Sequence, residues 1–151
     1  MTKSNDPNVA RKAWMSLLAK VSATELSQLW EGLGLSPSYA ILRAPEIGSV
    51  MVRGRAGAVG ASFNLGEVTV TRCSLRLESG ADGHAYVQGR NKDKALQAAM
   101  IDALMQTDVA QAVQDNILTP LRQGFDTAKA TRAAKAAATK VDFFTIARGE
   151  D

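Results

Sequence analysis

Apolar residues recur at helical spacing near the start of the chain. Between residues 7 and 21 they return every three or four positions, which predicts an amphipathic helix capped by Asp6. The capping-box sequence of residues 22–25 predicts a second, shorter helix. That helix is expected to end at Gly32 or Gly34, since glycine readily adopts the left-handed conformation that stops a helix.

The middle of the chain reads instead as a series of strands. Glycine, proline and polar turn residues divide this region into short apolar segments. The pattern predicts strands at residues 39–43, 49–53, 61–65, 67–77 and 84–88. The third and fourth of these are expected to form a hairpin at Gly66.

The segment 67–77 changes the phase of its pattern. Val68 and Val70 share one face of a strand, whereas the apolar residues between 73 and 77 share the other. Either the strand is apolar on both faces in turn, or a bulge near Arg72 restores one continuous core face. The bulge is the favoured interpretation, because it keeps a single core.

The helix after the last strand is unusually apolar. Asn91 is a good N-cap, and the apolar residues from there to Met105 cover well over half of the helix circumference. Such a helix is buried by its own sheet and by a second surface, which is the first hint of a partner. Asp102 and Gln106 stand one turn apart on its narrow polar strip. They are expected to be solvated or to form hydrogen bonds at an interface.

The C-terminal part is rich in alanine. Pro120 is expected to curtail one helix, and residues 126–140 should form another, because alanine has high helix propensity. Alanine methyl groups bury little area, so this helix cannot anchor itself. Phe143 and Phe144 follow it. We therefore predict a basic, partner-docking helical arm and tail at residues 126–151.

These elements predict one α+β domain, residues 1–151. It should contain a mostly antiparallel sheet at about residues 39–88, flanked by N-terminal and C-terminal helices, with an extended C-terminal arm.

The charge of the chain is concentrated near its C-terminus. The net charge is +3, and residues 122–148 alone hold six basic and two acidic residues. The arm lacks the interleaved aromatic residues of single-strand binders, so nucleic acid is not the expected partner. No apolar run approaches membrane-spanning length, and a single cysteine fits a reducing cytoplasm. We therefore expect a cytoplasmic protein with no membrane contact.

The catalytic inventory is small. One histidine and one cysteine cannot supply a His/Cys metal set, and no motif indicates a cofactor. His84 follows a turn and favours a surface or hydrogen-bonding role over catalysis. Cys73 lies among leucines and favours a buried position as a small hydrophobic side chain.

Two groups of residues are candidate binding sites. The start of the apolar helix is a plausible anion or partner site, because helix N-termini and basic side chains attract anions. This first group contains Gln88, Gly89, Arg90, Asn91 and Lys92. The second group contains Arg53, Arg55, Arg72 and Arg76, which form one patch only if the two arginine pairs share a face of the sheet. A solvated outer face and a docking surface for an acidic partner or a polyphosphate are both open.

Several sequence blocks resemble the G subunit of the bacterial carbon–phosphorus lyase complex. The resemblance runs from about residue 11 to the end of the chain. Its most specific parts are YVQGR at residues 86–90, IDALMQ at residues 101–106 and VDFFT followed by RG at residues 141–149. Other blocks are AWMSLLA at residues 13–19 and TRCSLRL at residues 71–77.

The resemblance implies a role in phosphonate catabolism. The G subunit belongs to a core with H, I and J subunits and acts functionally with the L subunit. With H, I and L it supports formation of α-D-ribose 1-methylphosphonate 5-triphosphate from ATP and methylphosphonate, with release of adenine. The resemblance assigns the nucleosidase centre to the I subunit and no catalytic residue to this one.

We therefore expect an accessory subunit whose partner interface includes Arg148 and the two phenylalanines of the arm. The lone chain is expected to be inactive and to self-associate. The alternative is a stand-alone phosphate- or nucleotide-binding domain.

Overall fold

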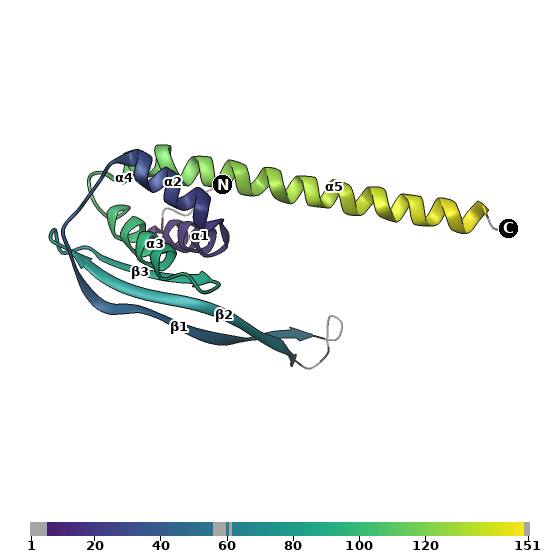
Figure 1. Ribbon diagram of the computed structural model, residues 1–151, viewed down its shortest axis with the longest axis horizontal. Coiled ribbons are helices and arrows are strands. Elements are labelled where there is room, and N and C mark those ends of the chain that lie inside the picture. Colours follow the sequence, from purple (N-terminus) through teal and green to yellow (C-terminus); the bar gives the residue numbers. More distant parts are fainter. Residues whose placement is uncertain (1–5, 56–59, 61, 150–151) are drawn as a thin grey trace.

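The computed structural model describes residues 6–55, 60 and 62–149, without the side chains of Arg55, Ser62, Asn64 and residues 140–149. The elements follow the order α1 (Pro7–Lys20), α2 (Ala23–Leu33), β1 (Tyr39–Arg55), β2 (Ser62–Leu77), β3 (Asp82–Gln88), α3 (Lys92–Leu104), α4 (Ala110–Val113), the π-helix η1 (Gln114–Leu118) and α5 (Thr119–Gly149). Helices cover one face of a three-stranded antiparallel sheet (Figure 1). The predicted α+β class and antiparallel sheet are confirmed.

Local capping signals define the first two helices as predicted. The Asp6 carboxylate accepts a hydrogen bond from the backbone N–H of Asn8, and Pro7 occupies the start of α1. The Ser22 hydroxyl accepts from the N–H of Glu25 at the start of α2. Gly34 ends α2 at φ 70°, in the left-handed region that glycine tolerates.

The sheet has three strands where five were predicted, because β1 and β2 each continue through a predicted break. Strand β1 is continuous through Pro45, because it is the edge strand and absorbs its extra residues as irregularities opposite β2. Strand β2 is continuous through Gly66, so the predicted hairpin there is wrong. Gly66 adopts φ 149° within the strand, and the register shifts beside it.

The predicted bulge near Arg72 is also wrong. Strand β2 pairs with β3 without a register shift from Val70 to Arg76, and the irregularities lie in β1 instead. The core face of β2 runs from Thr71 through Cys73 and Leu75 to Leu77, all buried. Val70 is buried outside the core cluster, so the strand carries apolar residues on both faces in turn.

Helix α3 forms the centre of the molecule. It packs against β2 and β3, and its other sides contact α1, α2 and α4. The second surface that its wide apolar coverage required is therefore supplied by the chain's own helices, and the inference of a partner from this helix was wrong. The contact with the sheet is very close, since a Cβ atom on Gly83 would lie 2.0 Å from the carbonyl oxygen of Ala99.

The last helix leaves the body of the molecule. Pro120 does not end the helical region as predicted, because the π-helix η1 precedes it and the chain continues into α5. The rise of an α-helix makes the 31 residues of α5 about 46 Å long. Figure 1 shows its C-terminal half projecting beyond every other element. Among the described residues, no helix combines the length and apolarity needed to cross a membrane.

Candidate functional site

The turn from β3 into α3 is held by one buried hydroxyl group. Thr71 Oγ1 donates to the carbonyl oxygen of Gly89 at 2.7 Å and accepts from the N–H of Asn91 at 3.1 Å. Gly89 adopts φ 92°, which favours glycine at this position. Asn91 Oδ1 accepts from the N–H of Lys94 at 2.9 Å, so the predicted cap of α3 is confirmed.

The side chains of the predicted anion site do not converge. Gln88, Arg90 and Lys92 are exposed around the turn, whereas Asn91 lines a polar cavity of about 300 Å³ where the N-terminal ends of α2 and α3 meet. The other residues lining that cavity are Ala23, Thr24, Ser27, Gln28, Asp93, Lys94 and Gln97. Anion binding at this turn stays a prediction.

Lys94, within the first turn of α3, is buried although it lies in a basic stretch. Its Nζ donates to the carbonyl oxygen of Ala19 at 3.3 Å, in the last turn of α1. Burial lowers the pKa of this ammonium group below its ordinary value. A cation at the carbonyl end of a helix is favourable, so Lys94 links the end of α1 to the start of α3.

The four candidate arginines do not form one patch. Arg72 Nε donates to Glu46 at 2.7 Å, and Arg76 Nε donates to Asp82 at 2.6 Å. The bond from Arg76 lowers the pKa of Asp82. These exposed pairs stabilise the fold little, but they neutralise the two arginines on β2.

The other two arginines lie near the far end of β1, away from that pair. Arg53 pairs in register with Asn64, and Arg55 with Ser62. Alternation along β1 from Glu46 places Arg53 on the face opposite to Arg72. The side chain of Arg55 lies outside the described residues, and the proposed interface role of the four arginines is untested.

A fully buried carboxylate connects three elements. Asp102 Oδ1 and Oδ2 accept from Arg11 Nε at 3.1 Å and Nη2 at 2.8 Å. Oδ1 also accepts from Trp14 Nε1 at 2.8 Å, and Oδ2 from the backbone N–H of His84 at 2.8 Å. Hydrogen bonding to Asp102 raises the pKa of Arg11. The expectation that Asp102 is solvated or at an interface was wrong.

Gln106 completes this network. Its Nε2 donates to the carbonyl oxygen of Asp82 at 2.7 Å and to that of Asp102 at 3.0 Å. Together, Asp102, Arg11 and Gln106 satisfy polar backbone groups along the edge of β3 that does not pair with β2. The carboxylate is saturated with donors, so it has a structural role. Arg11 and Trp14, spaced three apart on α1, are the sequence signal that points to it.

His84 and Cys73 were the other candidate reactive side chains, and they lie in different surroundings. His84 Nδ1 lies 2.9 Å from Ser74 Oγ on the exposed face of the sheet, and no described carboxylate hydrogen-bonds to its ring. Cys73 is buried, and its burial raises the pKa of the thiol, which makes it a poor nucleophile. Within residues 6–55, 60 and 62–149, no three His, Cys, Asp or Glu residues group closely enough to hold a metal ion.

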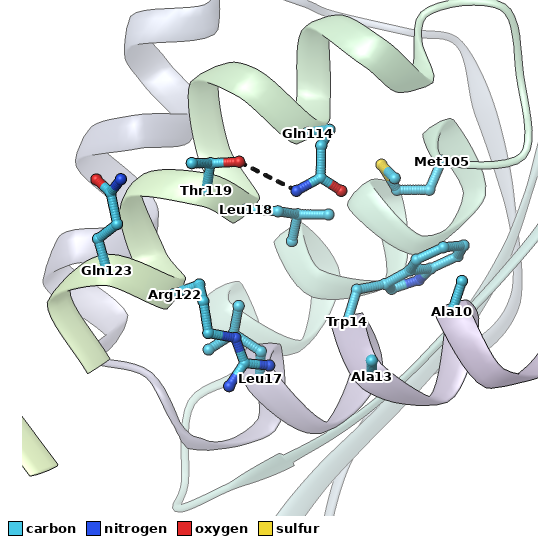
Figure 2. A pocket seen from close by; sticks show the side chains of 10 residues that line it. All are labelled: Ala10, Ala13, Trp14, Leu17, Met105, Gln114, Leu118, Thr119, Arg122 and Gln123. Atoms are coloured by element: carbon cyan, nitrogen blue, oxygen red, sulfur yellow. Dashed lines mark hydrogen bonds between the residues drawn. The ribbon is translucent and has the colours of Figure 1, made fainter. Parts of the chain in front are cut away.

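An apolar groove of about 460 Å³ lies where α1 meets η1 and the start of α5. Figure 2 shows side chains entering it from both sides, with Gln114 Nε2 donating to Thr119 Oγ1 at 3.1 Å. The groove is lined by Ala10, Ala13, Trp14, Leu17, Met105, Gln114, Leu118, Thr119, Arg122 and Gln123. It holds no acid–base pair, so its chemistry suits the binding of an apolar group.

The arm is exposed along its described length. Every side chain from Asp126 to Thr139 is exposed, including Lys129, Arg132 and Lys135. The side chains of Phe143, Phe144 and Arg148 lie outside the described residues. The arm therefore presents a row of basic groups to solvent, and its docking role stays a prediction.

Comparison with known proteins places this chain beside proteins of phosphonate metabolism. A sequence model of the family described as "Phosphonate metabolism protein PhnG" matches residues 9–149. A protein of Rhizobium meliloti (strain 1021), the alpha-D-ribose 1-methylphosphonate 5-triphosphate synthase subunit PhnG, is 42% identical over 149 residues. That match covers 98% of this chain and 96% of the relative.

Proposed function

Because the chain belongs to the PhnG family of phosphonate metabolism proteins, we propose that it is an accessory subunit of the carbon–phosphorus lyase complex. In this role it supports formation of α-D-ribose 1-methylphosphonate 5-triphosphate from ATP and methylphosphonate. The observation that carries the proposal is the end-to-end match to a relative named as a subunit of that synthase. A cytoplasmic location fits this metabolism.

The catalytic residues of the reaction belong to a partner subunit in this proposal, with the I subunit as the most direct partner. Two features of the described residues support it. The buried carboxylate of Asp102 is fully occupied by Arg11, Trp14 and His84. The ring of His84 contacts Ser74 Oγ and no described carboxylate, so it lacks the orienting carboxylate of a catalytic triad.

In this proposal the subunit binds the I subunit and helps to enclose the active site. Displacement of adenine from ATP requires an enclosed site with cations around a triphosphate. The basic arm and the exposed Arg90 and Lys92 are the groups of this chain that suit contact with the I subunit or its ligand. The H and J subunits of the core and the L subunit complete the set of proposed partners.

Reconstitution tests the proposal directly. The chain is co-expressed with the I subunit, and the complex is separated by size-exclusion chromatography. The two proteins are expected to co-elute, and the complete set of subunits is expected to release adenine from ATP only when this chain is present. Free I subunit together with full activity in its absence would refute the accessory role. Saturable ATP binding by the lone chain would favour the stand-alone nucleotide-binding domain.

Replacing Arg90 tests the helix start as a contact site. The Arg90→Ala variant is expected to reduce either complex assembly or adenine release by about tenfold, the effect of a lost charged contact. The exposed Lys20→Ala at the end of α1 serves as the matched control. Assembly and turnover at wild-type levels in the Arg90 variant would remove this residue from the site.

A further inference from the structure

The β1–β2 hairpin extends beyond the part of the sheet that the helices support. Strand β3 pairs only with residues 70–76 of β2. Residues 49–55 of β1 and 62–69 of β2, here called the ribbon, pair with each other and not with β3. Figure 1 shows the ribbon continuing past β3 and past α1 and α3. A two-stranded ribbon in water is marginally stable at best, so its length calls for a covering surface.

Both faces of the ribbon carry exposed apolar side chains. Met51 lies on the face that points toward the helices, whereas Val52 lies on the other face. Met51 is 49% exposed and Phe63 is 46% exposed. Leu65 is 62% exposed and lies across Gly54, whose Cβ position would be 3.0 Å from Leu65 Cδ1. Clustered exposed apolar residues of this kind mark a binding surface.

The charge of the ribbon end indicates the chemistry of its partner. The sequence from Val52 to Leu65 contains two arginines and no acidic residue. Arg53 is exposed and forms no ion pair with any described side chain, unlike Arg72 and Arg76. Arginine beside apolar side chains is the composition of an interface centre.

We propose that the ribbon docks into an apolar cleft of a partner subunit that presents a carboxylate to Arg53. This docking rests on the proposed function and identifies the surface through which the accessory subunit joins its complex. A second copy fits less well, because the one acidic residue of its ribbon, Glu67, lies inside the ribbon opposite Met51 and not at the end that carries Arg53. A free polyphosphate would pair with Arg53 but would leave the apolar side chains of Phe63 and Leu65 exposed to water.

Four variants of the full-length chain test the proposal in complex with the I subunit. Arg53→Glu and Leu65→Asp change the ribbon. Arg43→Glu and Val9→Asp are matched controls, since Arg43 is an exposed arginine of the same strand and Val9 is 54% exposed on α1. Each ribbon variant is expected to raise the Kd of the complex at least about tenfold, and each control by less than about threefold. Circular dichroism of the lone variants should match that of the wild type.

Hydrogen exchange provides a readout that needs no variant. Backbone amides of residues 49–55 are expected to exchange at least about tenfold more slowly in the complex, because docking excludes water from the ribbon. Unchanged exchange, or equal Kd values for ribbon and control variants, overturns the ribbon interface alone. Failure of the wild-type chain to bind the I, H or J subunits overturns the proposed function and the ribbon interface together.

Two further outcomes would replace the partner subunit with another occupant. If light scattering shows that the lone chain forms a dimer and that Leu65→Asp abolishes it, the ribbon binds a second copy. If the lone chain binds tripolyphosphate and Arg53→Glu abolishes that binding, the ribbon binds a phosphate ligand. Either result contradicts the docking proposed here.

Discussion

Asp102 shows how a single buried charge organises this fold. Its carboxylate accepts four hydrogen bonds from protein N–H groups in place of water. Two of them come from Arg11, whose side chain is 30% exposed. We expect Asp102→Asn to destabilise the chain by about 3 kcal/mol, because the guanidinium then loses its counter-ion in a partly buried site. Urea unfolding followed by tryptophan fluorescence measures this loss.

The matched control for that change is Asp126→Asn. Asp126 lies 3.9 Å from Arg122 in an exposed pair, so its loss should cost less than about 0.5 kcal/mol. Equal effects of the two substitutions would show that Asp102 gains little from its burial and its partners.

Lys94 predicts a pH dependence of stability with a definite sign. Burial lowers its pKa in the folded state, so between that value and the ordinary 10.5 the unfolded chain binds more protons than the folded one. Stability contributed by this group therefore rises with pH across that window. The difference in unfolding free energy between wild type and Lys94→Met should shift in favour of the wild type from pH 7.5 to pH 10 (approximate range of the assay).

Lys92→Met is the control, because Lys92 is exposed and lies two residues earlier on the same helix. The change with pH should be larger for the Lys94→Met difference than for the Lys92→Met difference. A constant difference for Lys94→Met would show that the Lys94 ammonium keeps its ordinary pKa in the fold.

At the scale of an element, we expect the binding of the arm to a partner to depend on its charge rather than on buried apolar area. Lys129, Arg132 and Lys135 are exposed on α5, so reversing all three to glutamate should leave the unfolding temperature of the lone chain unchanged. The same change should weaken binding to the I subunit by at least about tenfold if the arm meets acidic groups. The wild-type affinity should also fall as salt rises, because exposed charges are screened.

Reversing Lys12, Lys20 and Arg43 provides the control for the arm. These three exposed residues lie on α1 and β1, and their reversal changes the net charge by the same amount. Similar losses of affinity in both triple variants would mean that overall charge, rather than docking of the arm, drives association.

Elements were predictable from sequence where a few neighbouring residues determine them. Asn91 and Gly34 act within one helical turn, and the structure confirms both. Gly66 and Pro45 were misread as breaks, because pairing with the opposite strand includes Gly66 and resumes on both sides of Pro45. Asp102 was misread because α1, its main partner, is distant in sequence.

The same limit applies to the candidate site. Sequence reasoning found basic residues, but only the register separates Arg53 from the neutralised Arg72 and Arg76. The apolar stripe of α3 correctly indicated burial on several sides. It could not distinguish a partner from α1 and α2, since both supply the same kind of apolar surface.

The molecule as a whole exposes three candidate binding surfaces: the ribbon, the groove beside η1 and the arm. A chain with so much uncovered surface is expected to self-associate when its partners are absent. We expect the lone chain to form oligomers in a concentration-dependent manner and to release no adenine from ATP. Light scattering and an adenine assay measure these properties.

The apolar end of the arm is the segment best placed to drive that self-association. Phe143 and Phe144 belong to the C-terminal half of α5, which projects beyond the other elements (Figure 1). Replacing both with serine should shift the lone chain toward monomer, whereas Tyr86→Ser, which removes an exposed aromatic ring from the sheet, should not. A double variant that still forms oligomers at the wild-type concentration would contradict a role of these two residues in self-association.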